Sequence, residues 1–241
     1  FKESFTWTSV TASTYSARYS PAGAMFDNGG SSIFSPNHLF VIGGLINSVV
    51  ARRYFDVLSP SINYQPGEIG NLPYSGVLAE TGSLIYEGIK DLVGSNIKIS
   101  KYDWDSHETS WDFKANELIA LKNEVFLSIN GEKQSIPTLL TEILEDYKSK
   151  WSRLFYQLHS NEEELNRQFI EIYGLQDELT PDVPLEEITI LQQGEISIEN
   201  NEIVWHDDVI IKQLISYAVG CWMGRYRLDK PGLHIAHPNP S

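Results

Sequence analysis

Two stretches of this chain place apolar residues three or four positions apart, which is the spacing that one face of an α-helix requires. The first runs from Leu39 to Phe55 and the second from Ile136 to Leu158. Ser35-Pro36 precedes the first stretch as an N-cap followed by proline, and Pro60 prevents its continuation. Amphipathic helices bury their apolar face only against other elements, so we expect the core to form around these two helices.

The remaining segments predict short strands and further helices. Residues 1–35 are expected to form strands joined by turns, and residues 187–205 a hairpin that turns at Asn200-Asn201. Residues 97–114 are expected to be irregular. Further helices are predicted over 79–92, from a capping box at 160–163 to Gly174, and from Asp207 to Gly224.

The expected fold is therefore α+β. A small mixed lobe over residues 1–75 precedes a mainly helical domain with a β-hairpin over residues 76–241. The boundary is placed where a loop rich in turn residues ends at Asn71-Leu72-Pro73-Tyr74.

The composition is that of a folded protein, with 41% hydrophobic and 12% aromatic residues. A single cysteine, Cys221, excludes an internal disulfide and favours a cytoplasmic location. The longest nearly apolar run, residues 39–51, is too short for a bilayer, and Phe1-Lys2-Glu3 begins no signal peptide, so no membrane partner is expected. The missing initiator methionine and the ending Pro238-Asn239-Pro240-Ser241 suggest a fragment.

The net charge of −14 opposes contact with nucleic acid, but the charge is unevenly distributed. Residues 1–80 hold four basic and five acidic side chains, whereas residues 81–241 hold fourteen basic and twenty-seven acidic ones. The net charges are thus −1 and −13. The first third is the part expected to touch DNA, especially beside a basic partner domain.

One short motif bears on methyl transfer. Amino-methyltransferases hold an extruded base with an Asn/Asp-Pro-Pro-aromatic loop. Asn71-Leu72-Pro73-Tyr74 has leucine at the second position, and no apolar strand precedes it. No Gly-rich strand–loop for a methyl donor stands upstream, so no catalytic or cofactor-binding residue is predicted.

Metal and nucleophile motifs are equally weak. Asp112-Phe113-Lys114 and Asp146-Tyr147-Lys148 match half of a nuclease motif, but the only Pro-Asp pair follows both. The acids Asp103, Asp105, Glu108 and Asp112 lie among aromatic residues, where packing or docking is the favoured interpretation. His234 and His237 lack partner ligands, and a buried thiol is the default for Cys221. No metal site is predicted.

Recognition of DNA needs polar side chains on a rigid frame, with Arg or Lys at the phosphates. The candidates in the first third are Lys2, Arg18, Tyr19, Arg52, Arg53, Asn63, Tyr64 and Gln65. Arg52-Arg53 closes the first predicted helix, so a favourable charge at a helix end explains this pair equally well. Asn63 and Gln65 carry amides that pair with adenine edges, although a plain turn also accounts for the segment.

Segments spread over nearly the whole chain carry a family resemblance. In the first third they are Ser31-Ser32-Ile33-Phe34, Leu45-Ile46-Asn47-Ser48, residues 60–69 and Leu72-Pro73. Beyond it they are residues 103–106 and 108–113, Glu163-Glu164-Leu165-Asn166, Ile172-Tyr173-Gly174-Leu175, residues 216–221, Gly224-Arg225-Tyr226 and residues 229–233. They resemble the large adenine-specific DNA methyltransferases of BREX phage-defence systems, the PglX type, which are akin to type IIG restriction–modification enzymes.

The resemblance implies a parent enzyme that methylates N6 of adenine in a short DNA site with S-adenosylmethionine. Residues 1–75 would be the C-terminal part of its target-recognition domain, and Leu72-Pro73 the exit from that lobe. The fragment itself is expected to hold no cofactor and to be no enzyme alone. Its expected partners are double-stranded DNA, the missing N-terminal methyltransferase domain and other BREX subunits.

Two other functions remain open. Residues 76–241 would serve as an interaction scaffold if their acidity docks the methyltransferase onto other subunits of the defence complex. A free-standing nuclease or methyltransferase is the third possibility, and we expect no such activity.

Overall fold

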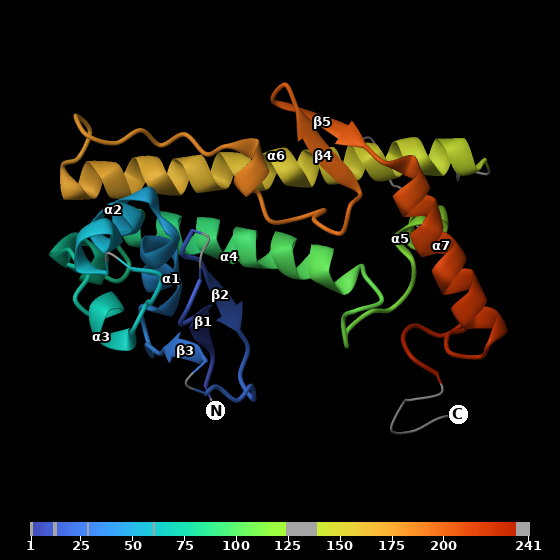
Figure 1. Ribbon diagram of the computed structural model, residues 1–241, viewed down its shortest axis with the longest axis horizontal. Helices are drawn as coiled ribbons and strands as arrows, with labels where there is room; N and C mark the ends of the chain where they lie inside the picture. The colour runs from blue at the N-terminus through green and yellow to red at the C-terminus, as the bar shows by residue number, and fades with distance from the viewer. Residues whose placement is uncertain (1, 12–13, 28, 60, 124–138, 235–241) are drawn as a thin grey trace. The chain divides into compact units, whose positions relative to one another are not determined.

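The structure is a computed structural model that describes residues 2–11, 14–27, 29–59, 61–123 and 139–234. Helices alternate with two small antiparallel sheets (Figure 1), which confirms the predicted α+β class. The chain packs into two compact units. Unit 1 comprises residues 1–98 and 158–183, and unit 2 comprises residues 99–157 and 184–241.

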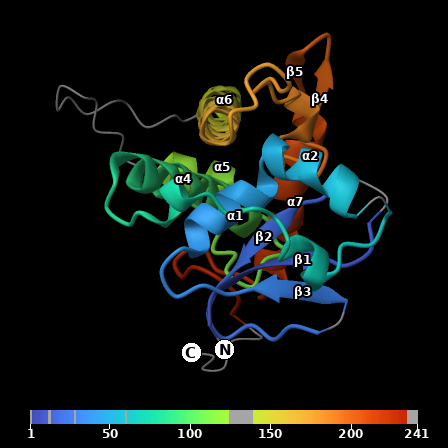
Figure 2. The ribbon, with the colours of Figure 1, turned by 90° about the vertical axis from the view of Figure 1, so that its left-hand side faces the viewer.

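Unit 1 contains a three-stranded antiparallel sheet of order β2-β1-β3. The strands are β1 (Ser4–Thr8), β2 (Ala17–Ser20) and β3 (Gly30–Ile33), so the short strands expected before residue 35 are present. Side chains alternate between the two faces. Phe5 and Trp7 are buried on one face, where α1 and α2 lie (Figure 2), and Thr6 and Thr8 point the other way.

The helix predicted from Leu39 to Phe55 is in fact two helices, α1 (Leu39–Asn47) and α2 (Val49–Leu58). The break is Ser48, whose backbone is extended at φ −76° and ψ 160°. Its hydroxyl accepts the N–H of Ala51 at 3.3 Å and donates to the carbonyl of Leu45 at 2.7 Å. A serine that caps one helix while closing another stops the apolar pattern from forming one continuous helix.

Glycines let α1 lie close to its neighbours in unit 1. A Cβ at Gly43 would lie 2.2 Å from the ring of Phe5, and one at Gly44 would lie 2.8 Å from Val93. Beyond α2, the chain forms α3 (Pro66–Ile69) in what was expected to be a loop, and the 3₁₀ helix η1 (Gly76–Ala79).

Two long helices, α4 (Leu84–Asp105) and α6 (Leu140–Tyr173), contribute to both units. Residues 97–105 therefore continue a helix, where irregular structure was expected. The capping box at 160–163 is also wrong as a helix start, because it lies inside α6. Asn161 is buried there and donates to Asn96 Oδ1 at 2.7 Å, so α4 holds this turn in the helix. Gly174, at φ +67°, ends α6 as predicted.

Unit 2 adds α5 (Glu117–Asn123), the 3₁₀ helix η2 (Leu185–Glu187), β4 (Ile196–Glu199), β5 (Glu202–Trp205) and α7 (Asp207–Trp222). The predicted hairpin and last helix are confirmed, whereas α5 was not foreseen. Asn200 and Asn201 both have positive φ, 52° and 62°, as a two-residue type I′ turn requires. Within the described ranges, every helix is too short or too polar to cross a bilayer.

The two compact units are defined by which residues pack together, and neither unit begins or ends at residue 75, where the sequence analysis placed a boundary. The proposed division by role, a recognition lobe over residues 1–75 and a helical domain over residues 76–241, stays a prediction.

Candidate nucleic-acid interface

The face of the sheet opposite the core of unit 1 is lined by hydroxyl groups. Strand pairing sets Thr6 opposite both Arg18 and Ser32, so these three side chains share that face. Thr8 and Arg18 are exposed, and Thr6 and Ser32 are partly exposed. Arg18 therefore stands on a polar surface of small side chains, where a DNA backbone can approach closely.

The loop that carries Asn63 and Gln65 is fixed to the end of β1 through its backbone. Tyr64 donates its N–H to the carbonyl of Ser9 at 2.8 Å, and the carbonyl of Tyr64 accepts the indole N–H of Trp7 at 2.9 Å. The ring of Tyr64 packs against Tyr15, with centroids 5.0 Å apart. The loop thus has a fixed course despite lying outside a regular strand.

The side chains of Asn63 and Gln65 are exposed on either side of this anchored tyrosine. An antiparallel bridge sets Asn63 opposite Val10, which is 54% exposed. Val10 continues the alternation of Thr6 and Thr8, so Asn63 lies on the same side of the sheet as Arg18. The structure therefore brings Arg18 and Asn63 onto one surface, with Gln65 next to it.

The other sequence candidates have other surroundings. Tyr19 donates its hydroxyl to Glu3 at 2.7 Å and packs edge-on against Phe40, and the hydrogen bond to Glu3 raises the pKa of Tyr19 to about 12. Lys2 is exposed ahead of β1. Arg53 lies 4.0 Å from Asp56 on α2, and Arg52 is half-buried.

The helix-end explanation for Arg52-Arg53 is wrong, because α2 runs on to Leu58 and its last turn holds no basic residue. The pair lies in the middle of the helix.

The segment Asn71-Leu72-Pro73-Tyr74 is bound to its own unit. The carbonyl of Pro73 accepts the hydroxyl of Tyr173 at 2.5 Å, and the hydroxyl of Tyr74 donates to the carbonyl of Leu78 at 2.7 Å. A methylation loop needs its backbone carbonyl and aromatic ring free for a base. These contacts favour a structural role for the segment.

Unit 2 holds a buried polar cluster that the sequence did not indicate. His107 Nε2 lies 2.6 Å from Glu195 Oε1, and the two side chains are 5% and 0% exposed. His107 Nδ1 faces the backbone carbonyl of Asp103 at 2.7 Å, so this nitrogen must donate. Glu195 also accepts from Gln213 Nε2 at 2.6 Å and from the N–H of Gln193 at 2.9 Å.

These contacts make the histidine and glutamate an ion pair. Burial alone would lower the pKa of His107, but the hydrogen bond and charge of Glu195 outweigh it and raise that pKa. Burial alone would raise the pKa of Glu195, but hydrogen bonds from His107 and Gln213 outweigh it and lower that pKa. Burial raises the pKa of Asp103 to about 6, although the hydrogen bond from the Leu191 N–H and the charge of His107 act against this shift. The cluster fastens α4 to the segment before β4.

The acidic residues between 103 and 112 do not all line one site. Asp103 is buried with Leu191, whereas Asp105 and Asp112 both bind Lys101, at 2.6 and 2.8 Å. Among the described residues, no three His, Cys, Asp or Glu side chains are grouped to hold a metal ion. His237 lies outside the described residues.

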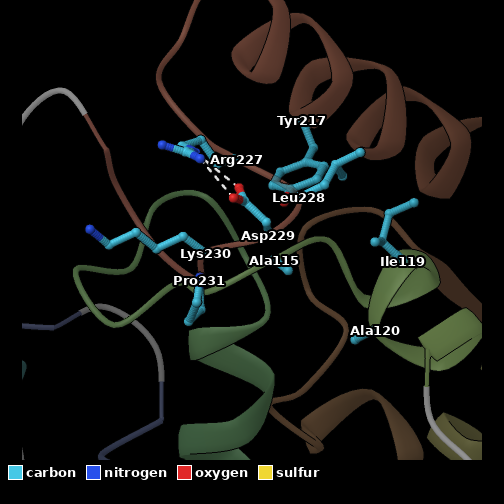
Figure 3. Close-up of a pocket in the computed structure, with 9 residues that line it drawn as sticks. All are labelled: Ala115, Ile119, Ala120, Tyr217, Arg227, Leu228, Asp229, Lys230 and Pro231. Carbon is cyan, nitrogen blue, oxygen red and sulfur yellow. Dashed lines mark hydrogen bonds and ion pairs between the residues drawn. The ribbon is translucent and has the colours of Figure 1, made fainter. Parts of the chain in front are cut away.

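Unit 2 also has a shallow hollow of about 150 Å³ between α5, α7 and the loop at 227–231 (Figure 3). Arg227 at its edge makes two hydrogen bonds to Asp229, at 2.9 and 2.7 Å, drawn as dashed lines in Figure 3. The Asp229 carboxylate thus offsets the charge of Arg227, one of the two basic residues that line the hollow together with Lys230.

Comparison with known proteins places the chain in a class. No family model matches it. Curated relatives match nearly its whole length, and both are described as adenine-specific methyltransferases. Over nearly its whole length the chain is similar to a segment of these adenine-specific methyltransferases.

The relatives are of the PglX and BrxX kind. The chain is 34% identical over 238 residues to PglX of Lacticaseibacillus casei (strain Zhang). It is 32% identical over 244 residues to BrxX of Escherichia coli O9:H4 (strain HS). In both comparisons 98% of this chain is matched, and the chain spans 18% of the relative's length.

Proposed function

We propose that this chain is the C-terminal, non-catalytic portion of a site-specific adenine-N6 DNA methyltransferase of a BREX phage-defence system, and that it contributes target recognition and positioning. Its similarity to two adenine-specific methyltransferases over only 18% of their length supports a part that serves chemistry done elsewhere in the polypeptide. The absence of methyl-donor motifs from the sequence points the same way.

One observation carries the recognition role. Asn63 and Gln65 are exposed amides on a loop whose backbone is held by Ser9 and Trp7. Asn and Gln bind the N6 and N7 edge of adenine with two hydrogen bonds, and such pairs discriminate between bases only on a rigid support.

The surrounding surface suits the DNA backbone. Arg18 supplies a positive charge, and the hydroxyls of Thr8 and Ser32 can bind phosphate oxygens without steric obstruction. In this arrangement Arg18 sets affinity and register, and the two amides set sequence.

The methyl donor belongs to the rest of the enzyme. S-adenosylmethionine supplies the methyl group when bound, but the residues of this chain do not fit a donor site. The sequence contains no Gly-rich strand–loop of the kind that holds this donor, and the segment Asn71-Leu72-Pro73-Tyr74 corresponds to a base-binding loop.

The test is to map methylated sites and measure DNA affinity with the complete enzyme carrying Asn63→Ala or Gln65→Ala. We expect each variant to lose preference at particular base pairs, by about 1–3 kcal/mol for each lost bidentate contact. Gln176→Ala removes another exposed amide of unit 1 and should change nothing. Unchanged site choice in both loop variants would refute the recognition role.

Arg18→Ala should act differently. It should weaken binding to all sequences alike and reduce the slope of log K against log salt by roughly 1, because one phosphate contact is lost. Lys98→Ala, an exposed cation elsewhere in unit 1, is the matched control.

An interaction scaffold is the second candidate. It is favoured by the −13 charge of residues 81–241, which repels DNA and attracts basic protein surfaces. Pull-down experiments with the complete enzyme and the other defence subunits, with and without nuclease treatment, separate this role from DNA binding.

A further inference from the structure

Helix α7 already has a complete inner face. Tyr217 and Gly220 are buried, and Tyr226 stacks on Tyr217 with ring centroids 5.2 Å apart. Phe113 meets Tyr217 edge-on at 5.9 Å. The helix therefore needs no further contact to be held in unit 2.

A second apolar stripe runs along a different side of the same helix. Ile215, Val219 and Trp222 are spaced by four and three positions, so they lie on one side, turned away from Tyr217 and Gly220. They are 56%, 40% and 85% exposed. Met223 adds to the end of the stripe at 74% exposed. A helix that is apolar on two sides is typical of a protein interior.

Polar side chains border this stripe, and they form ion pairs and hydrogen bonds with other residues of the chain. Lys212 and Asp208 form an ion pair at 2.8 Å, and Ser216 donates to Glu108 at 3.1 Å. An apolar centre with a paired polar rim is the composition of a protein–protein contact. With Asp207 and Asp208 in its first turn, the helix offers little to a phosphate backbone.

We propose that the stripe of Ile215, Val219 and Trp222 docks on an apolar surface in the remainder of the same methyltransferase polypeptide. This inference rests on the proposed function only in taking the chain as part of a longer enzyme. The relatives have 18% of their length matched by this chain, so most of the polypeptide lies outside it. A stripe covered within one polypeptide does not remain as an exposed apolar patch.

The test uses the complete enzyme with the photo-crosslinking residue benzoylphenylalanine in place of Trp222. We expect a crosslink within one polypeptide to a peptide outside these 241 residues. The same residue at Lys212, on the polar border, should give markedly less of that product. Crosslinks confined to the 241 residues, to a second copy or to another protein would each overturn the proposal.

A second measurement guards against local disturbance by the crosslinker. Ile215→Ser with Val219→Ser should speed hydrogen exchange in the crosslinked outside peptide, while peptides around Phe113 and Tyr226 keep their protection. Unchanged exchange outside would contradict docking. Site choice by the Asn63 and Gln65 variants is measured independently, so failure of docking and failure of DNA recognition are distinguishable.

Discussion

The ion pair between His107 and Glu195 makes the stability of unit 2 depend on pH. The pKa of His107 is raised by folding, so its contribution is complete below about pH 6.5, the unperturbed value, and is lost as pH rises through the folded pKa. The pKa of Glu195 is lowered, so its contribution is present above its ordinary value and is lost as pH falls through the folded pKa. The pair is therefore strongest in mildly acidic solution.

Asp103 also makes the folded protein less stable as pH rises, as His107 does. Its pKa is raised from 3.8 to about 6, so the folded protein holds this proton more tightly than the unfolded chain does. Its ionisation opposes folding as pH rises between these values. Both groups thus lower stability toward alkaline pH, Asp103 up to about its folded pKa and His107 beyond it.

We predict that Glu195→Gln removes most of the alkaline loss while lowering stability overall. Urea unfolding of the wild type and the variant at about pH 5.5 and about pH 8.5, on either side of the ordinary histidine pKa, measures both effects. The variant should be destabilised more at the lower pH, because there it loses a charged partner of a buried imidazolium. An equal loss at both values would show that the histidine is not charged in the folded protein.

At the scale of elements, Ser48 and Ser160 have opposite roles. Ser48 caps α2 and is 3% exposed, whereas Ser160 lies on the exposed side of α6, inside the helix. Ser48→Ala should destabilise the protein by about 1 kcal/mol through loss of the cap. Ser160→Ala should be neutral or slightly stabilising, because alanine is the better helix former. Denaturant unfolding of both variants checks the pair, and a comparable loss at Ser160 would contradict a continuous α6.

The same two serines show what the sequence could and could not predict. Helix faces and the Asn200-Asn201 turn are local patterns, and they were found. Whether a cap signal is used depends on a distant partner. Asn161 finds one in Asn96 of α4, and Ser48 sits beside Val49, whose N–H is bound by Asn166 Oδ1 at 2.9 Å. Contacts across 65 and 117 residues carry no periodic signal.

The candidate interface also has a part that the sequence predicts and a part that only the structure shows. The residue types pointed to Arg18, Asn63 and Gln65, but only strand pairing shows that Arg18 and Asn63 share a surface. The same types also pointed to Tyr19 and Tyr64, which pack against neighbouring rings. His107 and Glu195, 88 residues apart, were not singled out, because a lone histidine and a lone glutamate show no sign of their partner.

For the whole molecule, the net negative charge limits how strongly the chain alone can attract DNA. Within unit 1, residues 158–183 hold one basic and seven acidic side chains, so the near-neutral residues 1–98 fold together with an acidic helix. If the chain recognises DNA as proposed, long-range attraction to DNA would have to come from another part of the polypeptide. Arg18 and the two amides would act once that part has brought the duplex close, as groups that select among sites already reached.

The same division of labour predicts how the chain treats the methyl donor. Titration of this 241-residue chain with S-adenosylmethionine in a calorimeter should give no saturable heat, whereas the complete enzyme should bind it. The reason is that the sequence contains no Gly-rich strand–loop of the kind that holds this donor. Separately, the Pro73 carbonyl, which a base-binding loop would keep for its substrate, is bound by Tyr173. Tyr173→Phe releases the carbonyl and provides the sharper test. If that release alone created donor-dependent methylation in the chain, the segment would be a catalytic loop in a closed state, and the assignment of recognition without catalysis would be wrong.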